Sequence, residues 1–252
     1  MEKEEIILGL DVSTKTLGCT LFLNDGSELG KILKMTHISP KVSPSIKTIE
    51  KLFLKKKIFN DEFLVNYKDY DISRVIIEAP LYGSQNINTV ATLLQFNGMI
   101  SDCVYNELGI VPEYISSYDA RKYSFPELMS IRKFNKKGEL YDLKHYKNAI
   151  SKNQLVLFGA FPWDISKKEV LLGNISELYP NVKWVFDKHG NLTEENFDSV
   201  DSLVAILGKI NMDKYKDCDF KIISSSFEKK DEIIYQIKFG DKTIDKVLSI
   251  KA

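Results

Sequence analysis

The sequence predicts an α/β fold in which helices flank a mixed β-sheet. Three β-type runs come first, and the pair Asp25-Gly26 favours a hairpin between the second and the third. Two further strand patterns follow, and a long helical pattern separates them. Three consecutive strands, then strand–helix alternation, then a terminal helix predict this architecture. The expected strands cover residues 5–11, 17–24, 30–38, 74–78 and 112–117.

Two helices are expected in the first half of the chain. Ser43-Pro44 favours the start of the first one, and apolar residues then recur at helical spacing until about Tyr67. The second helix covers 88–108, where the pattern is apolar on the side that would pack on a sheet. Pro80 ends the strand that precedes it.

The later part of the chain predicts two more helices and a small β-meander. Ser166 favours a helix over 167–179, and the terminal helix is expected over 196–207. Beyond Asp213, the runs DFKIISS, EIIYQIKF and KTIDKVLSI are typical of short strands, with Gly240-Asp241 as one turn.

The distribution of these patterns along the chain predicts the domain organisation. Residues 123–163 are basic and aromatic and predict no regular element apart from a turn at 136–138. We therefore expect one α/β domain at 1–213, with a basic insertion at about 123–163. A short C-terminal β extension at 214–252 is expected to follow.

The composition is that of an ordinary globular chain. Of the 252 residues, 44% are apolar, which is enough for a sizeable core, and no run reaches the roughly 18–20 apolar residues of a membrane span. The acidic segment that follows Met1 does not suit a secretory signal. Cys19, Cys103 and Cys218 form no CxxC pair, so we expect no zinc site and a reducing, cytoplasmic location.

The formal net charge is zero, from 35 basic and 35 acidic residues, but the charges are unevenly distributed. Residues 121–152 hold nine Lys or Arg against three Asp or Glu, whereas residues 187–219 hold eight acids against four bases. Cations that contact phosphates and carboxylates that hold a metal ion are both needed by a metal-dependent nuclease. The charge pattern therefore favours that class despite the neutral sum.

Four carboxylates are the candidate metal ligands. Asp11 and Glu78 end two of the expected buried strands, and Asp198 and Asp201 lie three apart on the otherwise apolar terminal helix. Carboxylates from separate elements are what a two-Mg²⁺ phosphodiester hydrolase needs. Acids at strand ends are also common loop residues, and a DxxD pair often lies on a solvated helix face or a helix N-terminus. Both interpretations stay open at this level.

Three motifs resemble those of RuvC-type Holliday junction resolvases, in the RNase H-like class. They are GLDVSTKTLGCTLF at 9–22, VIIEAPLYG at 75–83 and FDSVDSLVAIL at 197–207, and the resemblance covers roughly 5–122 and 165–210. It implies an RNase H-like fold, metal-ligand roles for the four carboxylates, and Mg²⁺ as cofactor with Mn²⁺ as a substitute. It also implies hydrolysis of branched DNA to 5′-phosphate and 3′-hydroxyl ends by a homodimer.

The resemblance implies further DNA contacts at less specific positions. An aromatic residue follows the second motif in the family, where this chain has Leu81 and Tyr82. Phosphate-neutralising cations would correspond to Arg121 or Lys122 and to Lys167 or Lys168, although ordinary packing or a solvated helix face would account for any of these six residues.

The chain also departs from the family pattern. Ser13 stands where many relatives have glycine, and neither 123–163 nor the tail after 213 has a counterpart in a minimal member. Elaborated members resemble proteins of large phages and viruses, so we expect the cytoplasm of a bacterial cell or of an infected host. Thr14 and Lys15 follow Asp11 closely enough to meet a phosphate, but a hydrogen-bonded turn explains them as well.

Three other functions compete with a resolvase. An actin-like or sugar-kinase-type ATPase also opens with a strand that ends in Asp, but it needs a second phosphate loop that is not found after residue 80. Another RNase H-like nuclease that acts on RNA or RNA/DNA hybrids would use the same carboxylates. A non-catalytic nucleic-acid-binding protein of this fold is the third, and the intact set of four acids argues against it.

Overall fold

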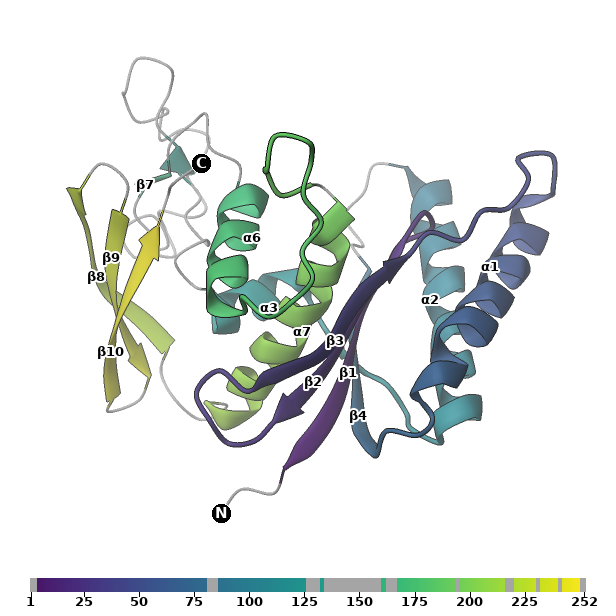
Figure 1. The fold of residues 1–252 in the computed structure, drawn as a ribbon, viewed down its shortest axis with the longest axis horizontal. Coiled ribbons are helices and arrows are strands. Elements are labelled where there is room, and N and C mark those ends of the chain that lie inside the picture. The colour runs from purple at the N-terminus through teal and green to yellow at the C-terminus, as the bar shows by residue number, and fades with distance from the viewer. Residues whose placement is uncertain are drawn as a thin grey trace. The chain divides into compact units, whose positions relative to one another are not determined.

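The computed structural model describes residues 4–80, 86–125, 132–133, 160–161, 167–193, 195–215, 220–229, 232–239 and 242–249. The chain forms two compact units. The first consists of Met1–Ala120 and Tyr179–Lys209, and the second of Arg121–Leu178 and Ile210–Ala252. Figure 1 shows the elements of both units in chain order.

The first unit is built on a five-stranded sheet of order β3-β2-β1-β4-β5. β1, β2 and β3 pair antiparallel, whereas β4 pairs parallel with β1 and with β5. This order is the RNase H-like arrangement that the motif resemblance implies, and the predicted mixed sheet is confirmed. The strands are β1 (Glu5–Val12), β2 (Leu17–Asn24), β3 (Lys31–Ile38), β4 (Ile72–Glu78) and β5 (Glu113–Ile115).

Helices α1 (Thr48–Glu62) and α2 (Ile87–Leu108) lie against one face of the sheet. Side chains from alternate strand positions form the main core with them, because successive strand residues point to opposite faces. The strand residues of this core include Leu8, Leu10, Val12, Leu17, Cys19, Leu21, Val75 and Ile77. The helices and the 3₁₀ turn Leu64–Tyr67 contribute Leu52, Phe59, Phe63, Leu64, Tyr67, Phe96, Ile100, Cys103 and Val104.

The first predicted helix differs from the structure at both ends. It begins at Thr48 rather than at Ser43-Pro44, and the side chain of Lys47 makes no capping hydrogen bond. Phe63 leaves helical geometry, with φ −121° and ψ −69°, so the chain continues as a separate 3₁₀ turn.

The second helix has local start and stop signals. The side chain of Asn86 caps its N-terminus, and Gly109 ends it with φ 71°, which glycine adopts without strain.

Helix α7 (Glu195–Lys214) covers the opposite face of the sheet and is longer than predicted. It approaches the strands closely because two of the residues under it are glycines. A methyl group at Gly9 would lie 2.4 Å from the carbonyl oxygen of Ser202, and one at Gly18 would lie 1.8 Å from that of Asp198. The hydroxyls of Thr20 and Ser202 also meet at 2.7 Å across this contact.

The second unit contains α6 (Lys167–Leu178), the short parallel pair β6 (Arg132–Lys133) and β7 (Ala160–Phe161), and an antiparallel sheet of order β10-β9-β8. This sheet confirms the predicted C-terminal meander. The predicted turns at 136–138 and 240–241 lie outside the described residues. The three strands are β8 (Phe220–Lys229), β9 (Glu232–Phe239) and β10 (Lys242–Ser249).

Helix α3 (Ser117–Ser124) is an element that the sequence did not predict. The expected strand at 112–117 ends at Ile115, and the Ser116 hydroxyl then accepts a 3.0 Å hydrogen bond from the Asp119 backbone N–H. A serine in this position is a common helix N-cap. In the part of the chain that the structure describes, none of the helices has the length and apolar character to cross a membrane.

The contact at Gly18 generates a stability prediction. Gly18→Ala should lower the free energy of unfolding by about 2 kcal/mol or more, because the added methyl must push α7 away from the sheet. Urea denaturation measures the change. Gly98→Ala in α2 is the matched control, since nothing lies within 4 Å of that added methyl and alanine favours a helix. Equal stability of the two variants would contradict the close packing described for α7.

Candidate metal centre

Asp11 and Glu78 lie at the ends of two neighbouring parallel strands. The β1–β4 register pairs Leu10 with Ile77, and each of these residues is followed directly by one of the acids. Leu10 and Ile77 point into the α1/α2 core, so the next residue on each strand faces α7. The backbone therefore places both carboxylates side by side on the α7 face, at the same end of the sheet.

Helix α7 brings the other two carboxylates to this end of the sheet. The backbone of Asp198 lies against Gly18, and Gly18 is the residue that pairs with Asp11 across the β1–β2 ladder. Asp201 follows one turn later and is only 6% exposed, and its sequence neighbours Val200 and Ser202 are also buried. A carboxylate buried on an apolar helix is stable only with compensating partners, and a metal ion is one such partner.

The turn after β1 links two of the motifs directly. The Ser13 backbone N–H donates to the Thr16 carbonyl at 3.0 Å, and the Ser13 hydroxyl accepts from the Thr16 N–H, also at 3.0 Å. This bonding holds Thr16 so that its hydroxyl donates to the Asp198 carboxylate. Lys15 is exposed in the same turn. The hydrogen-bonded turn considered for Thr14 and Lys15 is thus present.

Neighbouring groups from the α1/α2 side hold the end of β1 in place. The Asn97 amide donates to the Val12 carbonyl at 3.4 Å and to the Leu93 carbonyl at 3.0 Å. Behind Asp11, the Cys19 thiol is buried, and burial together with the charge of Asp11 raises its pKa. Cys19 therefore stays protonated near neutral pH and is a packing residue rather than a nucleophile.

The chemistry of the four carboxylates fits Mg²⁺, which prefers oxygen ligands and retains several waters. Their side chains do not form a preformed metal-binding cluster. Among the described residues, no group of three or more His, Cys, Asp or Glu side chains is arranged to hold a metal ion. The four metal-ligand roles remain a prediction that the backbone positions support.

The other residues predicted to contact DNA lie in the second unit or outside the described residues. Leu81 and Tyr82 lie outside the described residues. Arg121 and Lys122 are in the last turn of α3, and Lys167 and Lys168 open α6. All four cations belong to the second unit, whereas the carboxylates belong to the first. Their contact with nucleic acid stays a prediction.

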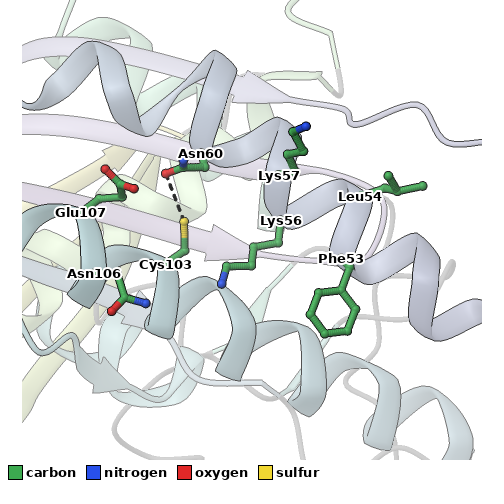
Figure 2. Close-up of a pocket in the computed structure, with 8 residues that line it drawn as sticks. All are labelled: Phe53, Leu54, Lys56, Lys57, Asn60, Cys103, Asn106 and Glu107. Carbon is green, nitrogen blue, oxygen red and sulfur yellow. Dashed lines mark hydrogen bonds between the residues drawn. The ribbon is translucent and has the colours of Figure 1, made fainter.

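A cavity of about 470 Å³ lies between α1 and α2, and no predicted site residue lines it (Figure 2). Several of its polar groups are already engaged. Lys56 pairs with Asp102 at 2.6 Å, and the Cys103 thiol donates to the Asn60 side-chain oxygen at 3.4 Å. Burial raises the pKa of Cys103 to about 11, so the thiol is not an activated nucleophile. The four carboxylates therefore remain the candidate site.

Comparison with known proteins gives likenesses of fold only. No family model and no curated protein matches the sequence. Among solved structures, T. thermophilus RuvC in complex with Holliday junction substrate is 9% identical, with a TM-score of 0.49 over 83% of this chain and 95% of that chain. The yeast mitochondrial Holliday junction resolvase is 11% identical, with a TM-score of 0.41 over 84% of each chain. An Aquifex aeolicus PPX-GPPA enzyme is 8% identical, with a TM-score of 0.37 over 82% of this chain and 91% of that chain.

Sequence reasoning missed the Thr16–Asp198 bond, and this bond generates a prediction. A hydrogen bond to a metal-binding carboxylate orients it, and its loss typically weakens metal affinity by about tenfold or more. Thr16→Val should therefore weaken Mn²⁺ binding about tenfold in calorimetric titration, whereas Thr16→Ser keeps the hydroxyl and should bind like the unaltered protein. Unchanged affinity in the valine variant would show that Asp198 needs no such orientation.

Proposed function

We propose that this protein is a metal-dependent endonuclease that hydrolyses branched DNA, with Holliday junctions as the substrate class. The observation that carries the proposal is the placement of four carboxylates by three elements at one end of the sheet. Asp11 and Glu78 end adjacent parallel strands, and α7 supplies Asp198 beside Gly18 and Asp201 one turn later. Carboxylates held by rigid strands and a helix are what metal-assisted phosphodiester hydrolysis requires.

The residues have distinct tasks in this proposal. Asp11 and Glu78 would hold or bridge two Mg²⁺ ions, because their strands fix them side by side, and Asp198 and Asp201 would complete the ligand set. When bound, the ions supply a more acidic water and neutralise charge on the phosphate. Thr16 orients Asp198 through its hydroxyl. The products would carry 5′-phosphate and 3′-hydroxyl ends.

A four-way junction has two-fold symmetry, and its resolution requires two symmetric nicks. We therefore propose a two-fold homodimer, which presents two copies of the carboxylate site to the two strands. Mn²⁺ is expected to replace Mg²⁺, because it accepts the same oxygen donors.

A nuclease of the same fold that acts on RNA or RNA/DNA hybrids is the second candidate. The carboxylates do not distinguish the two, because they meet the phosphodiester rather than the base or the sugar. The DxxD spacing of Asp198 and Asp201 and the residues around all three motifs favour the resolvase. A panel of substrates therefore has to accompany the first activity assay.

Cleavage should depend on magnesium and on the buried acid of α7. Asp201→Asn should lower the cleavage rate of a labelled four-way DNA junction on the order of a thousandfold, because several kcal/mol of transition-state stabilisation depend on the metal ligands. Single-turnover assays in Mg²⁺ and in Mn²⁺ measure the rate, and EDTA should abolish it. Asp213→Asn, at the far end of the same helix, is the matched control and should cleave normally.

The substrate panel decides between the alternatives. Paired symmetric nicks in the junction, with a matched linear duplex left intact, are expected for a resolvase. Cleavage of an RNA/DNA hybrid in place of the junction would move the assignment to the second candidate. No cleavage of any substrate in either metal, by a protein shown to be folded, would rule out the proposed activity.

A further inference from the structure

Three lysines form a row along one ridge of α1. Lys51 and Lys55 lie four residues apart in α1, the spacing that puts side chains on the same side of a helix, and Lys47 precedes them by four residues at the N-cap position. We call them the α1 lysine row. Lys47 is exposed at the start of the helix. The Lys51 ammonium donates to the Pro44 carbonyl at 2.8 Å, and the Lys55 ammonium donates to the Thr14 carbonyl.

No carboxylate neutralises the α1 lysine row within the described residues. The ammonium groups of Lys51 and Lys55 meet only backbone carbonyls, which leave their charge in place. The next lysine on the same helix differs, because Lys56 pairs with Asp102 at 2.6 Å. Burial lowers the pKa of Lys55, and the charge of Lys51 lowers it further. Lysines held close together without acids repel one another in the free protein, and a bound anionic ligand would relieve this repulsion.

The α1 lysine row lies at the same end of the sheet as the carboxylates. Thr14, whose carbonyl binds Lys55, belongs to the turn that directly follows the strand of Asp11. In the same turn, Thr16 donates to Asp198. One short turn therefore separates the lysines from the acids, and Lys15 adds an exposed cation between them.

We propose that the α1 lysine row binds the phosphate backbone of the nucleic acid that the carboxylates cleave. The proposal rests on the proposed function and names a surface that fixes the substrate beside the site. Four helical residues rise about 6 Å. Each phosphate of one DNA strand advances about 3.4 Å along the axis, so this step is close to two phosphate steps. The contact is to phosphates, so it carries no sequence preference.

The salt dependence of binding tests the proposal. Each phosphate contact contributes about 0.9 to the slope of log K against log salt concentration on duplex DNA. The double variant Lys51→Gln/Lys55→Gln should therefore lower the slope by about 2 and weaken binding at least about tenfold at 0.1 M salt. Binding to a four-way junction is measured in EDTA, so that no cleavage intervenes. Glutamine can still donate to the Thr14 carbonyl, which preserves the tie to the turn.

Two further variants separate charge from structure. Lys56→Gln/Lys57→Gln removes the same charge from the same helix but off the row, and it should keep the slope of the unaltered protein. Lys51→Arg/Lys55→Arg keeps the positive charge and should also keep the slope of the unaltered protein.

An unchanged slope in the Lys51→Gln/Lys55→Gln variant would overturn this proposal alone, provided that the unaltered protein still cleaves the junction. Failure of the unaltered protein to bind any nucleic acid would overturn the proposed function as well. Loss of binding to anionic lipid vesicles in place of DNA would identify the row as a membrane contact and also overturn it.

Discussion

The structure of the first unit depends on the close contact between α7 and strands β1 and β2. Gly9 and Gly18 leave room for the helix backbone, and any larger residue would force the two elements apart. The same contact that buries the apolar side of α7 also sets Asp198 opposite the strand of Asp11. Packing and chemistry therefore share one interface, and a shift that relieved a clash here would also separate the proposed ligands.

The turn Ser13–Thr16 connects this interface to the other side of the sheet. Its own hydrogen bonds make it rigid, and its outward contacts reach α7 through Thr16 and α1 through Thr14. Helices on opposite faces are thus joined at the end of the sheet where the carboxylates lie. Such cross-bonding restricts motion at this end of the sheet, and a functional site needs its side chains held to within about 0.5 Å.

A chain with zero net charge has no overall attraction for nucleic acid. The uneven distribution of its charges removes this difficulty. The sequence pointed to the basic segment 121–152 as the source of phosphate contacts, and little of that segment lies within the described residues. We propose a second source at the start of α1, where Lys47, Lys51 and Lys55 recur every four residues. Local field rather than net charge governs phosphate binding, so acids that hold a metal and lysines that hold phosphates can coexist at one end of a neutral protein.

The sequence by itself predicted where most strands and the long helices lie along the chain, because hydrophobic period is a local property. It also predicted the four acids as candidate ligands from their positions at strand ends and on the terminal helix. Only the tertiary structure decided that Gly18 meets Asp198, that Thr16 orients this carboxylate, and that lysines of α1 reach the turn after Asp11. It also decided the start of α1 and the existence of α3. The contacts of Gly18 and Thr16 with Asp198 join residues as many as 182 positions apart, which no local pattern encodes.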